Sequence, residues 1–104
     1  MNKVFISVGM NGRTHEDIVA DLTRAREWVD KNIREKYGDH IEVVDNLDCT
    51  GPADAGCLWY LGEAIKKLDG CDMCYFVKGW QEYRGCRAEM KICCLYSIPT
   101  IEEK

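Results

Sequence analysis

The sequence predicts an α/β fold in which a four-stranded parallel sheet is covered by helices on both faces. Short β-branched and aromatic runs alternate with longer segments whose apolar residues recur every three or four positions, as they do on one face of a helix. Strands that alternate with helices are joined by right-handed crossovers into a parallel sheet. A chain of 104 residues is long enough for one small domain, so residues 1–104 are expected to form a single doubly wound, three-layer sandwich.

The first strand is predicted at residues 3–7, and a glycine-containing loop follows it up to Arg13. Thr14 is expected to cap a long helix that ends near Gly38. The apolar stripe of this helix is formed by Ile18, Leu22, Ala25, Val29 and Ile33.

A second strand is predicted at residues 41–44, and a polar loop over residues 45–53 follows it. Asp54 is expected to cap the next helix, which ends before Gly70. The third strand is expected to begin at residue 71 or 72. The apolar stripe of the second helix is formed by Leu58, Leu61, Ile65 and Leu68.

The region over residues 78–85 is polar and rich in glycine, which predicts a loop before the last helix. Residues 97–101 supply a last strand, and Pro99 favours an edge position for it. The alternation predicts a flavodoxin-like or Rossmann-like arrangement with strand order 2-1-3-4. The inward stripe of the last helix is expected at Ala88, Ile92 and Leu95.

The charge balance argues against polyanionic partners. The chain has 14 Lys and Arg against 18 Asp and Glu, a net charge of −4, without a clustered basic stripe. We therefore expect neither duplex nucleic acid nor a membrane as a partner. The sequence has no apolar run long enough to span a membrane and no signal-peptide pattern at its N-terminus, so a cytoplasmic location is expected.

Seven cysteines raise the possibility of disulfides, a metal site or redox chemistry, but the number is odd. Cys71 and Cys74 form a C-x-x-C at the start of a predicted strand, where residues three apart point to opposite faces. A thioredoxin-like redox pair instead precedes a helix. We expect free, mostly buried thiols and no metal, with Cys86, Cys93 and Cys94 packed in the core of the last helix.

A doubly wound sheet binds ligands outside the carboxyl ends of its strands, where the strand order reverses. This rule is expected to bring together residues 7–13, 45–53 and 78–87. The first of these segments precedes a helix, so its amides can hold a phosphate or a sugar hydroxyl. An ordinary strand-to-helix turn explains the same residues equally well.

Glu89 is the candidate catalytic carboxylate. It lies in the first turns of the last helix, beside the expected crevice and on the side of Ala88 and Ile92. A shielded carboxylate that faces a cleft is suited to act as a nucleophile or general base. The alternative is that Glu89 only complements the helix dipole.

Four short motifs together resemble a known group of proteins. The first motif has Ile6 and Ser7 followed by Met10 and Gly12, and the others are Gly70-Cys71-Asp72, Gly79-Trp80 and Gly85-x-x-x-Glu89. In order and spacing they resemble the small phage and bacterial proteins grouped with the nucleoside deoxyribosyltransferases, a superfamily that includes deoxynucleoside 5′-monophosphate N-hydrolases. The resemblance spans the whole chain.

This resemblance implies roles for particular residues. It implies that Glu89 is the nucleophile that attacks the anomeric carbon of deoxyribose, and that Asp72 is the aspartate associated with the active site, although Asp72 also fits a simple turn after Gly70. Trp80 and Tyr83 are expected to stack on a base, and the alternative is that these aromatic side chains pack locally. The resemblance further implies that Ser7, Gly12 and Arg13 hold a 5′-phosphate. The other residues expected to bind the substrate are Gly9, Met10 and Gly85.

The implied activity is cleavage of an N-glycosidic bond in a deoxynucleoside or deoxynucleotide, or exchange of its base. The chemistry needs no metal or organic cofactor. The expected partner is a small nucleoside or nucleotide, and a homodimer or higher homo-oligomer is expected. The alternatives are a non-catalytic module that binds or senses a nucleotide and, on the cysteines alone, a thiol-based redox protein.

Overall fold

The computed structural model describes residues 1–104 and contains a four-stranded, all-parallel sheet with strand order β2-β1-β3-β4. The predicted fold class and strand order are therefore confirmed. The strands are β1 (Lys3–Ser7), β2 (Glu42–Val44), β3 (Met73–Phe76) and β4 (Thr100–Glu102). β4 is an edge strand, as Pro99 indicated.

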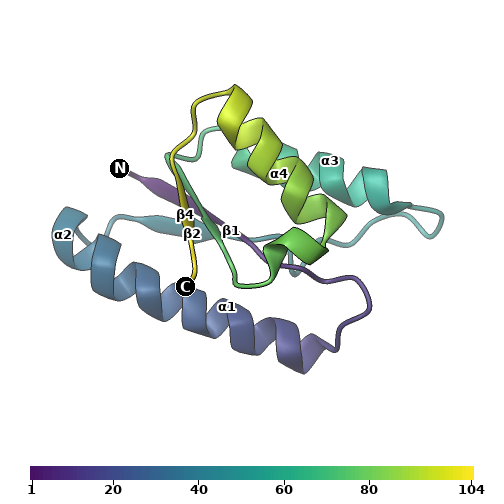
Figure 1. The fold of residues 1–104 in the computed structure, drawn as a ribbon, viewed down its shortest axis with the longest axis horizontal. Coiled ribbons are helices and arrows are strands. Elements are labelled where there is room, and N and C mark those ends of the chain that lie inside the picture. The colour runs from purple at the N-terminus through teal and green to yellow at the C-terminus, as the bar shows by residue number, and fades with distance from the viewer.

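The helices form two layers around this sheet (Figure 1). On one face lies α1 (His15–Val29), which continues through a π-helical turn (Asp30–Arg34) into the short α2 (Glu35–Tyr37). α3 (Cys57–Leu68) and α4 (Arg84–Leu95) lie on the other face. The predicted cap of the first helix is confirmed, since the Asp17 amide donates to the Thr14 hydroxyl at 3.2 Å.

Each face of the sheet contributes to its own apolar cluster, because alternate residues of a strand point to opposite faces. Val4 and Ile6 of β1 pack in the cluster under α1, whereas Phe5 packs in the cluster under α3 and α4. All five apolar positions predicted for the first helix are buried in the former cluster. Ser7 shares the strand face of Phe5, so its side chain is directed towards the layer that contains α4.

Two predictions for α3 are wrong. The helix begins at Cys57 after an extended Gly56, because Asp54 lies in a turn closed by the hydrogen bond from the Ala55 amide to the Pro52 carbonyl. Leu58 is 81% exposed, since α3 meets the sheet through the half that contains Ala64 and Leu68.

The buried face of α4 is rotated from the predicted stripe. Leu95 is 66% exposed, and Ala88 and Ile92 are only half-buried. The buried positions of α4 are Cys86, Glu89 and Cys93, whose spacing of three and four is that of one helix face. The buried face of α4 therefore carries two thiols and a carboxylate instead of the predicted apolar stripe.

All seven cysteines are free. Cys71 precedes β3 instead of lying in it, and it packs in the same apolar cluster as Cys74, so the prediction that the two thiols face opposite sides is wrong. Cys94 is exposed, which corrects its predicted place in the core, and Cys57 is exposed too. The fully buried thiols are those of Cys74 and Cys93.

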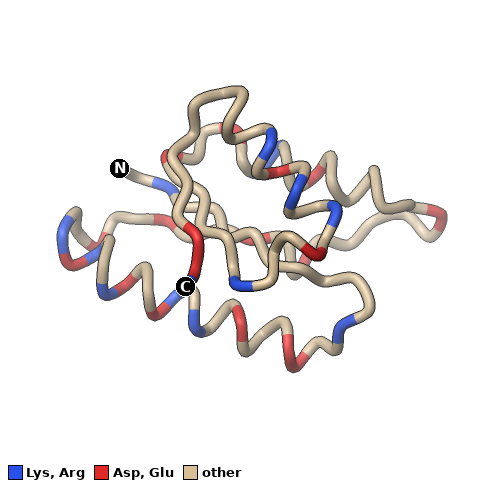
Figure 2. The backbone as a smooth tube through the Cα atoms, in the orientation of Figure 1, with Lys and Arg blue, Asp and Glu red and all other residues tan.

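None of the helices has both the length and the apolar character needed to cross a membrane. α1 carries charges of both signs, with acidic residues in its first half and both signs in its second half (Figure 2). The outer surface of that helix is therefore a mixed, solvated face.

Candidate functional site

The loops that follow β1 and β3 adjoin at the carboxyl edge of the sheet. β1 and β3 are neighbours in the sheet, and the Val77 amide donates to the Ser7 carbonyl at 3.0 Å just beyond their paired residues. β2 lies on one side of β1 while β3 and β4 lie on the other, so this is the point where the strand order reverses. The prediction that these two loops meet is confirmed.

Ser7 and Glu89 meet beneath this junction, and they are the only buried polar or charged residues of the protein. The Ser7 hydroxyl donates to Oε1 of Glu89 at 2.7 Å. Ser7 is 1% exposed and Glu89 is 6% exposed. Ser7 is a predicted substrate-binding residue, but its side chain is turned inward to the carboxylate.

Burial dominates the electrostatics of Glu89. Loss of solvent raises the pKa of Glu89 from 4.5 to about 7, and the Ser7 hydrogen bond acts in the opposite direction. The carboxyl group therefore changes its charge near neutral pH. A carboxyl group whose pKa is raised to near neutrality, at the edge where doubly wound sheets bind ligands, is a candidate for a catalytic role.

Cys86 lies beside Ser7 and Glu89, although it is not among the site residues predicted from the sequence. It is 2% exposed and lies one helical turn before Glu89. Burial raises the pKa of the Cys86 thiol to about 11, while its contact with the Ser7 hydroxyl acts in the opposite direction. The thiol is therefore neutral at pH 7. The signal in the sequence that could have identified Cys86 is its spacing of three residues from Glu89, which places both on one face of the helix.

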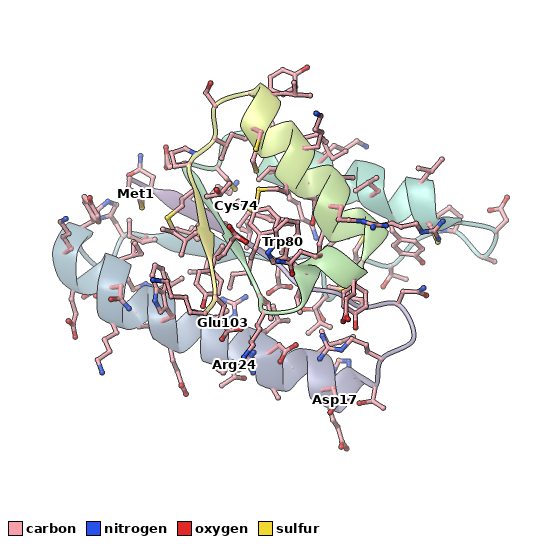
Figure 3. All side chains as sticks on the ribbon, in the orientation of Figure 1. Met1, Asp17, Arg24, Cys74, Trp80 and Glu103 are labelled. Atoms are coloured by element: carbon pink, nitrogen blue, oxygen red, sulfur yellow. The ribbon has the colours of Figure 1, made fainter.

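Arg13 does not extend towards an open ligand site. It donates to the Gly9 carbonyl at 2.9 Å and forms an ion pair with Asp21 at 2.7 Å. Asp21 also pairs with Arg24, which binds Glu103 near the end of β4 (Figure 3). This chain of charges ties the loop after β1 to α1 and to the C-terminal residues, so Arg13 supports the loop.

Gly9 allows Tyr83 to cover the loop after β1. A Cβ atom at Gly9 would overlap the ring of Tyr83, and the glycine is buried. Tyr83 immediately precedes α4, so this contact closes the two loops against each other. The predicted base-stacking side chain is thus engaged within the protein.

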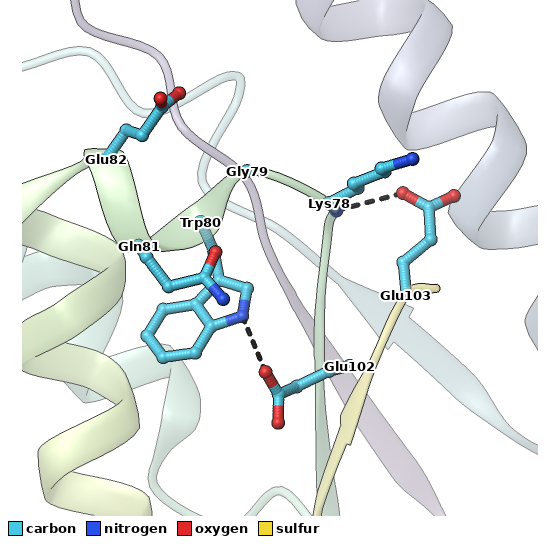
Figure 4. Close-up of a pocket in the computed structure, with 7 residues that line it drawn as sticks. All are labelled: Lys78, Gly79, Trp80, Gln81, Glu82, Glu102 and Glu103. Atoms are coloured by element: carbon cyan, nitrogen blue, oxygen red, sulfur yellow. Dashed lines mark hydrogen bonds between the residues drawn. The ribbon is translucent and has the colours of Figure 1, made fainter.

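Trp80 lies on a different surface. Its indole Nε1 donates to Glu102 at 3.0 Å, and its ring packs on Phe76 with ring centroids 5.3 Å apart. It borders an open hollow of about 520 Å³ at the ends of β3 and β4, where Lys78 donates its amide to Glu103 (Figure 4). Ser7 and Glu89 do not line this hollow.

Asp72 lies at the opposite edge of the sheet. Its Oδ2 accepts from the Asn2 amide at 2.7 Å and from the Lys3 amide at 3.0 Å, beside the start of β1. These amides lower the pKa of Asp72. The structure does not bring Asp72 to Glu89, because a residue that precedes a parallel strand lies at the amino edge. Its position matches the turn alternative.

The other predicted site residues are dispersed. Met10 is half-buried against the cluster under α1, Gly12 is an exposed turn residue with φ +75°, and Gly85 is exposed in the first turn of α4. The loop after β2 contacts α3, where Asn46 donates to the Tyr60 carbonyl at 3.2 Å. The structure shows no cluster of three or more His, Cys, Asp or Glu side chains that could hold a metal ion.

Comparison with known proteins gives no match to a protein-family model, to a curated protein or to a solved structure. The class of protein is therefore defined by its fold and by the residues of its site. The protein is a small doubly wound α/β domain with a buried carboxylate at the reversal of its strand order.

Replacement of Gly9 by alanine should destabilise the protein by about 1–3 kcal/mol, because the new Cβ displaces the Tyr83 ring from a packed position. Urea unfolding measures the change. The control is Gly62→Ala in α3, where nothing lies within 4 Å of the new Cβ and helix propensity favours alanine. Equal stability of wild type and Gly9→Ala would contradict the packing described for Tyr83.

Glu89 should make stability fall as pH rises. Its pKa is raised from 4.5 to about 7, so between these values the folded state retains a proton that the unfolded state has lost. From pH 5 to pH 8 the free energy of unfolding should drop by about 2–3 kcal/mol more in wild type than in Glu89→Gln. Urea unfolding at both pH values measures this, with exposed Glu82→Gln as the control. Identical pH dependence in wild type and Glu89→Gln would refute the raised pKa.

Proposed function

We propose that this protein cleaves the N-glycosidic bond of a deoxynucleoside or deoxynucleotide, with Glu89 as the nucleophile. The observation that carries the proposal is the contact between the only two buried polar residues, Ser7 and Glu89, at the reversal of the strand order. The motif resemblance to the nucleoside deoxyribosyltransferases supports the same assignment.

The environment of Glu89 suits this chemistry. Loss of a base from deoxyribose passes through an oxocarbenium-like state, and a carboxylate stabilises its positive charge most strongly where water is excluded. In the covalent step, a carboxylate oxygen of Glu89 bonds to the anomeric carbon as the bond to the base nitrogen breaks. The departing base carries away the electron pair of that bond and takes up a proton. Water then yields a hydrolase reaction, or a second base yields a transferase reaction.

The polar backbone around Glu89 supports a small anionic or hydroxyl-bearing ligand. The first turn of α4, which includes Gly85, is exposed at its start, and backbone amides at a helix N-terminus favour negative charge. The loop after β1 lies beside it through the contact between Gly9 and Tyr83. The proposal places a nucleoside or its 5′-phosphate between these elements, and it requires Tyr83 to move away from Gly9.

The proposal includes a cytoplasmic location and assembly as a homodimer or higher homo-oligomer. Exposed large apolar side chains on the helices that cover one face of the sheet support self-association. The most exposed of these are Leu58, Leu95 and Tyr96, at 81%, 66% and 75%.

The second candidate is a nucleotide-binding module without turnover. The closed contact of Tyr83 on Gly9 and the 6% exposure of Glu89 favour it, because a nucleophile must reach its substrate. This candidate shares the fold and the loops and does not require Glu89.

Replacement of Glu89 by glutamine should lower the rate of base release by at least about a hundredfold, the minimum expected from loss of a positioned catalytic group. Glutamine keeps nearly the same shape, so ligand affinity should change far less. The measurement is chromatographic detection of free base from a panel of deoxynucleosides and deoxynucleoside 5′-monophosphates.

Glu82→Gln is the matched control, since Glu82 is exposed, lies on the same loop-and-helix segment and borders the separate hollow. It should leave base release within about twofold of wild type. Nucleotide binding by wild type without any base release, together with equal binding by Glu89→Gln, would contradict the enzyme and favour the binding module.

A further inference from the structure

The two oxygens of the Glu89 carboxylate are not equivalent. Oε1 accepts the Ser7 hydrogen bond at 2.7 Å, and this is the only hydrogen bond made by the side chain. The protein has no fully buried polar side-chain atom without a partner. Oε2 therefore keeps some exposed surface, and it is the carboxylate oxygen without a hydrogen-bond partner.

Ser7 is fixed more firmly than a loop residue would be. It is the last residue of β1 and pairs with Phe76 of β3, and its carbonyl accepts the Val77 amide at 3.0 Å. Strand alternation directs its side chain to the face of Phe5, which is the face covered by α4. The hydroxyl is thus held at a set point between the sheet and the helix.

We propose that Ser7 is a positioning residue that holds Oε1 of Glu89 and leaves Oε2 as the atom that attacks the anomeric carbon. This inference rests on the proposed function, and it gives Ser7 a role different from the ligand contact that the motif resemblance implies. A sheet-anchored donor restricts the carboxylate to one rotamer, which reduces the entropy lost when the reacting atoms align.

Among the groups around Glu89, Ser7 is the one that donates a hydrogen bond to its carboxylate. Cys74 faces it from β3, and Cys86 and Cys93 face it from α4. Arg13, from the loop after β1, acts on Cys86. Thiols are weak donors, and no ion pair joins Arg13 to Glu89. Loss of the Ser7 hydroxyl should therefore leave the ionised carboxylate without a hydrogen-bond donor.

The test combines a titration with kinetics. In protein labelled with ¹³C at the glutamate carboxyl carbons, the Glu89 resonance is assigned from its absence in Glu89→Gln and is followed from pH 4 to pH 10. Ser7→Ala should raise the titration midpoint of Glu89 by about one pH unit, because a hydrogen bond to a charged group is lost. Ser97→Ala removes the same atom from an exposed serine and should leave the midpoint unchanged.

The kinetic arm measures base release at a pH above both midpoints. Ser7→Ala should lower kcat at least about tenfold with KM within about twofold, as expected for loss of an interaction that aligns the nucleophile. Ser7→Thr retains the hydroxyl and should restore the wild-type midpoint and most of kcat. Circular dichroism establishes that each variant is folded, and Ser7→Thr provides the comparison if Ser7→Ala does not fold.

The outcomes separate this inference from the proposed function. An active wild type whose Glu89 midpoint is the same in Ser7→Ala, or in which Ser7→Ala raises KM with kcat unchanged, overturns the positioning role and leaves the function intact. If Ser7→Ala does not fold, a Ser7→Thr variant with a raised midpoint and an unchanged kcat overturns it equally. A raised midpoint in Ser7→Ala with no base release by wild type overturns the function and retains the hydrogen-bond coupling.

Discussion

The hydrogen bond from Ser7 to Glu89 is the constraint on which the rest of the site depends. An ionised carboxylate with 6% exposure is costly unless a donor compensates for the lost water, and Ser7 is the donor that the fold supplies. The resulting balance holds the pKa of Glu89 at about 7, so the group is available in both charge states near neutral pH. The burial of Glu89 thus lowers stability at high pH and makes its carboxyl group titrate near neutral pH.

The surrounding elements maintain this contact. β1 and β3 fix Ser7 through the sheet, while α4 presents Glu89 between the thiols of Cys86 and Cys93. The ion pairs that run from Arg13 to Glu103 brace the loop above the site, and Gly9 lets Tyr83 pack on that loop. Tyr83 thus packs the start of α4 against the loop after β1, and Ser7 holds the Glu89 carboxylate from the sheet.

Much of this arrangement could be predicted from residue patterns. The order of strands and helices follows from the spacing of apolar residues, which is two in strands and three to four in helices. The meeting of the loops after β1 and β3 follows from strand order 2-1-3-4. The shielding of Glu89 could also be predicted. Its partner could not, because the sequence does not show which strand face α4 covers.

The errors have identifiable causes. The apolar residues Ala88, Ile92 and Leu95 have helical spacing, but the face of α4 that is buried carries Cys86, Glu89 and Cys93. Asp72 precedes β3 and so lies at the amino edge of a parallel sheet. Its distance from the site was predictable from topology, whereas the motif resemblance indicated the opposite.

The most direct measurement of the central claim is mass spectrometry of the intact protein after reaction with a deoxynucleoside substrate. A 2-fluoro substituent on the sugar destabilises the oxocarbenium-like state and slows breakdown of a glycosyl ester, so the intermediate accumulates before an acid quench. Nucleophilic attack by Glu89 predicts a mass increase of one fluorodeoxyribosyl group, located by peptide mapping at Glu89 and absent from Glu89→Gln. Release of free base with no adduct on Glu89, or with the adduct on another residue, would contradict the account.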